Sequence, residues 1–397
     1  MFRVFLWAMF VALQAGCAPA DEPSDNSPAA PSVTPAAREA SAPQEDYRVA
    51  GRRAIERGVQ CLIAAQTADG SWRSATYGPM RGGVGNTALA VYGLTRGATL
   101  PTREAHAAAE RGARFLLSNV APAGFVRGAD GKSDYPTYGT ALLLAALPKL
   151  ALEVNAETIG RLQAYVRSAQ LNARQGVQPS DREFGGWPQT GGDDSHLKRL
   201  GDTNISVTLA ALEGLEAGGV LSADVREATL AYLAHCQNWS ETAFDDGGFF
   251  FTPDAADPRN KAGQAKPGRA RSYGSATADG LCALALCGMP ENTRRREAAA
   301  GWLRQRFGVD EVAGFERPAD RTTFAAALYY YNAAATAHCL RRVPEFDSAE
   351  RRSALVLALV RRQQPDGSWR NASPHMYEDD PLLATSLALA ALGRLCE

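Results

Sequence analysis

The chain has 397 residues, of which 45% are hydrophobic, and its formal net charge is −1. This length and apolar content are enough for one large core in a single folded domain. The nearly neutral charge argues against a nucleic-acid partner, which would require a basic surface.

The first 17 residues have the composition of a lipoprotein signal peptide. Arg3 precedes a short apolar run over residues 4–13, which is too short to span a bilayer. The next residues read Gln-Ala-Gly-Cys, a pattern typical of lipid attachment at Cys17. Gln14 departs from the usual small or aliphatic residue at its position, so ordinary signal-peptidase cleavage after Ala18 or Ala20 is the alternative.

Residues 18–46 follow as a candidate tether. They contain six prolines, several acidic residues and no aromatic residue. Such a segment cannot bury enough apolar surface to fold, so we expect it to be disordered. Together, the two N-terminal segments predict an exported protein of the cell envelope, held by its lipid at the periplasmic face of a membrane.

One eight-residue pattern occurs at both ends of the remaining chain. Gln-x-x-Asp-Gly-Ser-Trp-Arg stands at 66–73 and again at 363–370. Four weaker versions between them keep a glycine followed by an aromatic residue. The six aromatic positions are Trp72, Phe125, Trp187, Phe249, Phe315 and Trp369. Neighbouring positions are 53 to 66 residues apart, a spacing that suits repeated pairs of helices.

Apolar residues recur at helical spacing on both sides of each aromatic position. The first helix of each pair carries charged residues, whereas the second is nearly uncharged, as in the Ala- and Leu-rich segment 140–147. A helix that is apolar all round is a buried one. We therefore expect an all-α (α/α)6 toroid over residues 47–397, with six outer and six inner helices. The expected helices are 47–66, 85–97, 102–118, 137–152, 156–171, 202–217, 222–237, 273–288, 291–307, 322–341, 347–363 and 380–395.

The repeated pattern resembles the QW motif of squalene and oxidosqualene cyclases, whose repeats are similar to those of protein prenyltransferase β subunits. The resemblance covers residues 47–396. It implies an α/α toroid in which the Gln and Trp side chains brace neighbouring repeats. In this sequence those positions are Gln66, Trp72, Gln363 and Trp369.

The resemblance does not extend to the catalytic motifs of these enzymes. The Asp-x-Asp-Asp motif of the cyclases is absent, and the nearest matches are acidic pairs at 193–194, 245–246 and 379–380. The zinc set of the prenyltransferases has only a weak counterpart in Asp279, Cys282 and His338, with altered spacing. We therefore expect neither a metal nor another cofactor.

The loops that carry the aromatic positions all precede inner helices, so they should gather at one end of the ring. The inner helices present their N-termini at this end, where backbone amides and the helix dipole favour polar ligands. The candidate catalytic residues there are Asp194, His196, Asp202, Tyr273, Asp379 and Asp380. The candidate ligand-binding residues are Tyr77, Tyr138, Trp187, Phe249, Arg271 and Tyr273. N-capping explains Asp202 and Asp379 equally well without any catalytic role.

Three functions remain open from the sequence. The first is binding of a hydrophobic, isoprenoid-type ligand inside the ring, where aromatic faces suit hydrocarbon or cationic groups. The second is a polysaccharide lyase or glycosidase, since the Gly-Gly-Trp-Pro-Gln segment at 185–189 looks like part of one pectate-lyase family. The third is a non-catalytic binding or scaffold module. A deep, dry, aromatic tunnel would favour the first function, an open cleft with acids about 5–10 Å apart the second, and a filled centre the third.

Overall fold

The structure is a computed structural model that describes residues 46–96, 102–128, 135–189, 202–239, 245–315 and 322–397. These residues belong to one compact unit, 45–397. Cys17 and the expected tether lie outside the described residues. None of the described helices combines the length and the apolar character needed to cross a membrane.

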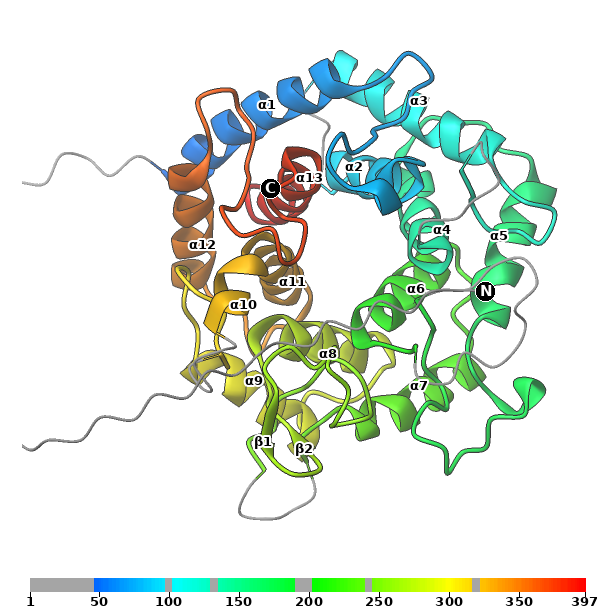
Figure 1. The fold of residues 1–397 in the computed structure, drawn as a ribbon, viewed down its shortest axis with the longest axis vertical. Coiled ribbons are helices and arrows are strands. Elements are labelled where there is room, and N and C mark those ends of the chain that lie inside the picture. Colours follow the sequence, from blue (N-terminus) through cyan, green and yellow to red (C-terminus); the bar gives the residue numbers. More distant parts are fainter. Residues whose placement is uncertain (1–45, 97–101, 129–134, 190–201, 240–244, 316–321) are drawn as a thin grey trace, which may run out of the picture. The chain divides into compact units, whose positions relative to one another are not determined.

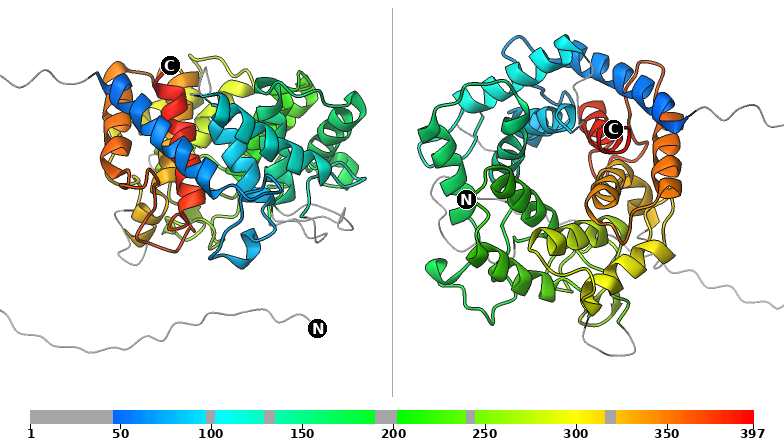
Figure 2. Two further views of the ribbon diagram at one scale, coloured as in Figure 1. Left: turned by 90° about the horizontal axis from the view of Figure 1, so that it is seen from above. Right: turned by 180° about the vertical axis from the view of Figure 1, so that it is seen from behind.

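The described helices form two concentric layers around a central axis (Figures 1 and 2). The outer helices are α1 Tyr47–Ala65, α3 Arg103–Ser118, α5 Ala156–Ser168, α7 Ala223–His235, α9 Arg294–Gln305 and α12 Ala349–Arg362. The inner helices are α2 Val84–Leu94, α4 Pro136–Ala146, α6 Ile205–Ala217, α8 Gly274–Leu286, α11 Tyr329–Arg342 and α13 Pro381–Leu395. Their arrangement confirms the predicted (α/α)6 toroid.

The layers differ as the charge pattern predicts. Ten of the eleven residues of α4 are buried, whereas α5 buries only Leu162, Tyr165 and Val166. Each inner helix packs on its two inner neighbours, and α13 packs directly on α2. Outer helices α12 and α1 also pack together. The first and last repeats therefore meet and close the ring.

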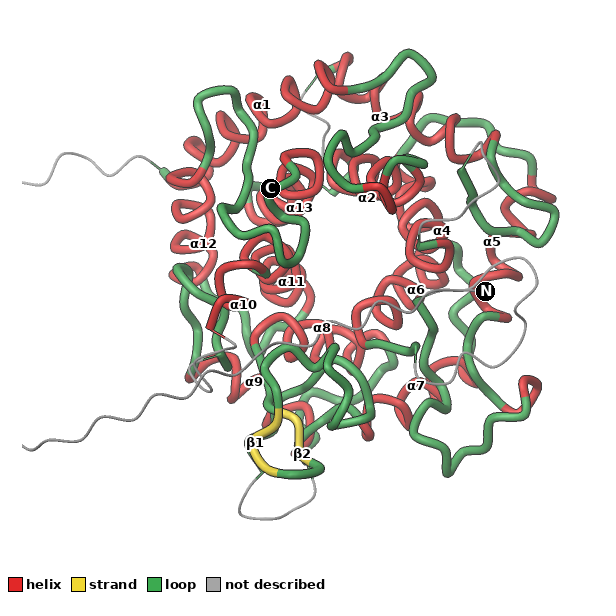
Figure 3. The backbone as a smooth tube through the Cα atoms, viewed as in Figure 1, coloured by secondary structure: helices red, strands yellow, loops and turns green. Residues whose placement is uncertain are grey.

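The structure departs from the expected helices in three places. The expected helix 322–341 is split at Leu328 into α10 (Thr322–Ala327) and α11. The expected helix 137–152 ends at Ala146 and continues as a single 3-10 turn, since Pro148 cannot extend an α-helical ladder. A short antiparallel hairpin, β1 Gln264–Lys266 and β2 Arg269–Ala270, also forms where no strand was expected (Figure 3). Further 3-10 turns lie at Gly78–Met80 and Ala173–Gln175.

Each aromatic position fills the wedge between an outer and an inner helix. Trp72, Trp187 and Trp369 are fully buried, and each indole N–H donates to a carbonyl oxygen of the preceding outer helix, at 2.6–2.8 Å. On the other side, the backbone N–H of the same residue donates to a threonine hydroxyl of the following inner helix. These threonines are Thr87, Thr208 and Thr385, and Thr140 and Thr277 accept equivalent bonds from Val126 and Phe249.

The glutamines link one repeat to the next. Gln66 Nε2 donates to the carbonyl of Gly70 in its own loop and to that of Ala108 in the next outer helix, both at 2.9 Å. Gln363 does the same with Gly367 and Ala54. Since Ala54 belongs to α1, this bond joins the sixth repeat to the first. The loop glycines permit the close approach: Gly367 has φ +85°, and a Cβ there would lie 2.5 Å from the Arg57 carbonyl oxygen.

Candidate functional site

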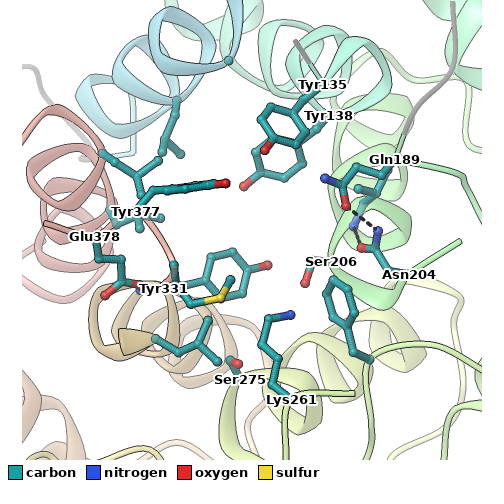
Figure 4. A pocket seen from close by; sticks show the side chains of 18 of the residues that line it. Tyr135, Tyr138, Gln189, Asn204, Ser206, Lys261, Ser275, Tyr331, Tyr377 and Glu378 are labelled. Atoms are coloured by element: carbon teal, nitrogen blue, oxygen red, sulfur yellow. Dashed lines mark hydrogen bonds between the residues drawn. The ribbon is translucent and has the colours of Figure 1, made fainter. Parts of the chain in front are cut away.

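A cavity of about 220 Å³ lies at the N-terminal ends of the inner helices. Residues of all six inner helices or their N-caps contribute to its wall, so it occupies the axis of the ring. Its apolar part consists of aromatic and aliphatic side chains: Met80, Leu89, Tyr135, Tyr138, Val207, Phe251, Tyr273, Leu328, Tyr331, Met376, Tyr377, Leu383 and Leu387. Figure 4 shows the hydroxyl groups of Tyr138, Tyr331 and Tyr377 turned toward the open centre.

Two of these tyrosines have strained backbones. Tyr135 (φ +53°) and Tyr377 (φ +63°) are the non-glycine residues with positive φ among the described residues. A side chain in this conformation costs on the order of 1–3 kcal/mol, and such strain gathers at functional sites. Both tyrosines line the same cavity, one before α4 and the other before α13 (Figure 4). Tyr377 is further held by the ring of Tyr77, whose centroid is 4.4 Å away.

A smaller chamber of about 50 Å³ continues the cavity along the axis, and the two share Leu89, Tyr138, Ser206, Tyr331 and Leu387. Asp279 of α8 lines this second chamber. Its Oδ2 accepts bonds from the Tyr331 hydroxyl at 2.8 Å and the Ser206 hydroxyl at 2.9 Å. Burial raises the pKa of Asp279 to about 7, although both hydroxyl donors favour the ionised form.

A buried charged network lines the far end of the smaller chamber. Glu213 of α6 accepts a bond from Tyr92 at 2.6 Å and lies 3.3 Å from both His338 and Arg394. Burial opposes ionisation of Glu213, but Arg394, Arg96 and the hydrogen bond from Tyr92 outweigh it and lower its pKa to about 2. Burial lowers the pKa of His338 to about 3, so the histidine is neutral near pH 7. The network ties four inner helices together across the ring axis.

The acidic cluster before α13 connects hairpins. Glu378 accepts the backbone N–H groups of Tyr330 and Tyr331, both at 2.8 Å, in the first turn of α11. Its carboxyl group points away from the cavity centre (Figure 4). Burial raises the pKa of Glu378 to about 8 despite these donors. Asp380 accepts from Ser74, and Asp379 from Tyr77, both in the first repeat.

The helix caps differ from the expected ones. Asn204, rather than Asp202, caps α6, and its Oδ1 accepts the N–H of Val207 at 2.9 Å. Asp380, rather than Asp379, caps α13. Both predicted caps precede the observed ones in the chain, because each helix begins later than the sequence predicted. Asp202 instead pairs with Arg259, with 3.3 Å between Nη1 and Oδ1.

The segment 252–272 is an ordered loop that contributes to the wall of the cavity. Asn260 holds its turn by accepting the N–H groups of Phe251 and Thr252. Arg259 is neutralised by Asp257, at 2.6 Å, and Arg269 by Asp245. Lys261 lines the cavity instead, and its Nζ lies 3.8 Å from the ring centroid of Phe251 (Figure 4). Burial lowers the pKa of Lys261 to about 8.

The structure brings together only part of the predicted site. Tyr138 and Tyr273 line the cavity, and Tyr77 supports it from behind. Trp187 and Phe249 lie outside the lining because both fill wedges between helices. Arg271 belongs to a separate surface pocket beside β2. Asp194 and His196 lie outside the described residues.

The weak zinc set does not converge in the structure. Asp279 contacts hydroxyl groups, His338 contacts Glu213, and Cys282 is buried as a free thiol. No group of three or more His, Cys, Asp or Glu residues suited to a metal ion occurs within the described ranges.

Sequence reasoning missed several residues that shape the cavity. Lys261 and the buried Asn86 were not among the predicted site residues, and Gln189 belonged only to the short pectate-lyase-like segment at 185–189. All three line the cavity. Asn86 and Ser275 could have been predicted as lining residues, because both are polar residues in the first turn of an inner helix, at the end where the cavity lies.

Comparison with known proteins supports the architecture. No family model and no curated protein sequence matches the chain. Solved structures do match: the type II terpene cyclase MstE from Scytonema aligns with TM-score 0.56 at 15% identity, covering 88% of this chain and 98% of the cyclase. The chain has an (α/α)6 toroid fold.

Solved structures of a glycosidase and of a sugar epimerase are also similar to this chain. A glycosidase variant aligns with TM-score 0.53 at 13% identity, over 89% of this chain and 98% of that one. Cellobiose 2-epimerase from Spirochaeta thermophila aligns with TM-score 0.53 at 14% identity, over 87% and 97%. At such identities the likeness establishes the fold alone, so the toroid does not by itself distinguish hydrocarbon from glycan ligands.

Proposed function

We propose that the toroid binds a hydrophobic, isoprenoid-type ligand in its central cavity. The observation that carries this proposal is the lining: thirteen aromatic or aliphatic side chains surround an open space on the ring axis. Burial of each CH₂ group of a ligand in such a space is worth about 0.8 kcal/mol. The open centre argues against a scaffold role, for which the space would be filled.

The unpartnered amide of Asn86 supports a bound ligand. Asn86 is 2% exposed, and neither its Oδ1 nor its Nδ2 has a hydrogen-bond partner among the described residues. A buried amide without partners costs about 1–3 kcal/mol per group. Because Asn86 lines the cavity, a polar atom of the ligand could satisfy it.

The terpene cyclase gives the proposal a precedent. One of its structures contains geranylgeranyl dihydroxybenzoate, described as the substrate. That ligand joins a long isoprenoid chain to a polar head group, and the cavity here likewise combines aliphatic walls with a few polar side chains. The precedent concerns the kind of ligand, and the cyclase acid motif is absent from this sequence.

A glycan ligand fits the cavity less well. Glycoside hydrolysis uses one protonated and one ionised carboxyl group on either side of the bond. The carboxyl groups of the two chambers are Asp279, Glu378 and Glu213. Burial raises the pKa of the first two to about 7 and 8, Glu378 is engaged by α11, and Glu213 is enclosed in its ionic network. The hydrocarbon ligand is therefore the proposed one.

The N-terminal sequence adds a location to this proposal. Lipid attachment at Cys17 would hold the toroid at the periplasmic face of a membrane. A tether of 29 residues reaches about 30 Å as a flexible chain. The membrane would then be both the anchor and the source of a hydrophobic ligand.

The test is native mass spectrometry of the full-length protein purified from membranes, followed by binding of farnesol. Leu387→Trp fills the boundary between the two chambers. We expect it to remove the co-purified ligand and the farnesol binding. Leu152→Trp adds the same bulk at a half-buried position away from the lining and should leave both unchanged. Farnesol binding that survives Leu387→Trp would contradict the proposed cavity.

A further inference from the structure

Five polar residues of the cavity form one wall, which hairpins three and four supply, whereas Asn86 of the first hairpin and Glu378 of the sixth line it elsewhere. Gln189, Asn204 and Ser206 come from the third repeat, while Lys261 and Ser275 come from the fourth (Figure 4). Hairpins five and six supply the aliphatic side chains Leu328, Met376, Leu383 and Leu387, together with Tyr331, Tyr377 and Glu378. A ligand with a polar end and a hydrocarbon end would therefore place its polar end against the wall of hairpins three and four.

A chain of hydrogen bonds fixes which atom Gln189 presents to the cavity. Asn204 caps α6, so its Oδ1 must accept the N–H of Val207 and its Nδ2 is left to donate. That Nδ2 donates to Gln189 Oε1 at 3.3 Å. The Nε2 donor of Gln189 is then directed into the open space, where no described residue accepts it (Figure 4).

The charge on this wall comes from Lys261. It is 9% exposed, and its Nζ contacts only the Arg259 carbonyl oxygen at 3.4 Å and the face of Phe251. No carboxylate of the described residues lies within ion-pair distance of it, since Asp257 and Asp202 pair with Arg259. A buried cation without a counter-ion is unfavourable, and a ligand anion would remove that cost.

We infer that Lys261 and Gln189 form a carboxylate-binding subsite for the polar end of the hydrocarbon ligand. The inference rests on the proposed function and specifies the ligand class as a hydrophobic monocarboxylic acid. The carboxylate accepts from Lys261 Nζ and Gln189 Nε2. The N-termini of α6 and α8 face the same space and favour an anion there.

The charge count selects a carboxylate over a phosphate. Among the described residues that line the main cavity, Lys261 is the sole cation. A phosphate monoester carries close to two negative charges and three acceptor oxygens, and its sites are typically built from several cations, Arg above all. One ammonium group and one amide match a single negative charge on two oxygens.

The test compares binding of farnesoic acid, farnesol and farnesyl phosphate to the full-length protein in detergent by isothermal titration calorimetry. Lys261→Met keeps the aliphatic stem over Phe251 and removes the charge. In the wild type, the acid should bind about 10- to 100-fold more tightly than the alcohol, as expected of a charged hydrogen bond. Lys261→Met should abolish this preference by weakening the binding of the acid at least tenfold more than the binding of farnesol, and Lys149→Met provides the variant with unchanged binding.

Three further variants test the assignment. Lys261→Arg should keep most of the preference, Gln189→Leu should reduce it several-fold, and Lys149→Met, at an exposed position away from the cavity, should match the wild type. The melting temperature of each variant is measured to verify folding. Retention of the preference for the acid in folded Lys261→Met overturns the inference.

The ligand series separates this inference from the proposed function. Equal binding of acid and alcohol by the wild type leaves the hydrophobic cavity standing and overturns the carboxylate subsite. Tighter binding of farnesyl phosphate than of farnesoic acid overturns the selection of a monoanion. If none of the three compounds binds, the proposed function fails and the subsite fails with it.

Discussion

Gln363 and Ala54 are 309 residues apart in the chain, yet the side-chain Nε2 of the first donates to the carbonyl oxygen of the second at 2.8 Å. Gln66 makes the same contact with Ala108 and so links the first hairpin to the second. The bond of Gln363 links the last hairpin to the first in the same way. A circular arrangement needs one such bond that reaches across the whole sequence. The ring therefore closes with the same interaction that builds it.

Removing this closing side chain should destabilise the toroid. Gln363→Ala leaves the carbonyl groups of Ala54 and Gly367 without their donor. At about 0.5–1.5 kcal/mol for each lost bond, we expect the free energy of unfolding to fall by about 1–3 kcal/mol. The neighbouring Gln364→Ala, which loses one 3.3 Å bond to Arg362, is the matched control. Equal urea midpoints for the two variants would show that the closing bond contributes nothing.

A loop glycine tests the spacing between repeats. Gly185 has φ +86°, and a Cβ there would lie 1.8 Å from the carbonyl oxygen of Ala228 in the next outer helix. Gly185→Ala must therefore separate the third and fourth hairpins, at a cost well above the roughly 1 kcal/mol of left-handed strain alone. Gly219→Ala carries that strain by itself, since Gly219 has φ +69° and open space around it. The melting temperature of Gly185→Ala should therefore be far below that of Gly219→Ala.

The predicted lipid anchor can be examined separately. Cys17→Ser removes the thiol that would accept the lipid. We expect the variant to lose radiolabelled palmitate and, with the lipid, its place in the membrane fraction. Cys61→Ser, at a half-buried thiol inside the ring, serves as the control and should remain labelled. A wild type that carries no palmitate label and is absent from the membrane fraction would support ordinary signal-peptidase cleavage instead.

The sequence was sufficient to predict the ring because its information is periodic. The contrast between charged outer and uncharged inner helices, and the paired positions of Trp72 and Trp369, depend on local composition alone. The threonine hydroxyls that hold the wedges were not predicted. A threonine in an apolar helix has no signal of its own until its partner, such as the N–H of Trp72 for Thr87, is placed beside it.

The cavity was harder to predict than the fold. Its polar wall combines residues from separate loops, and Lys261 is distinguished from Arg259 only by the direction in which each side chain points. Capping was predicted for Asp202 and Asp379, but the caps are Asn204 and Asp380, and Asn86 in the first turn of α2 lines the cavity without capping a helix. Orientation, which follows from tertiary packing, separates these cases.

The titration of Asp279 provides a test of the inner chamber. Burial raises its pKa in the folded protein to about 7, above the ordinary value of 3.8. Between these two values the folded state keeps a proton that the unfolded state releases. The contribution of this group to stability is therefore fully present below about pH 4 and is lost as the pH rises through 7.

Asp279→Asn replaces the carboxyl group with a neutral group of similar shape. Its free energy of unfolding should fall less than that of the wild type between pH 5 and pH 8, as measured by urea denaturation at each pH. Asp310→Asn, at an exposed aspartate that pairs with Arg362, should follow the wild-type slope. Parallel curves for wild type and Asp279→Asn would mean that Asp279 is ionised throughout this range. The bonds from Tyr331 and Ser206 would then outweigh its burial, and the chamber would hold a negative charge.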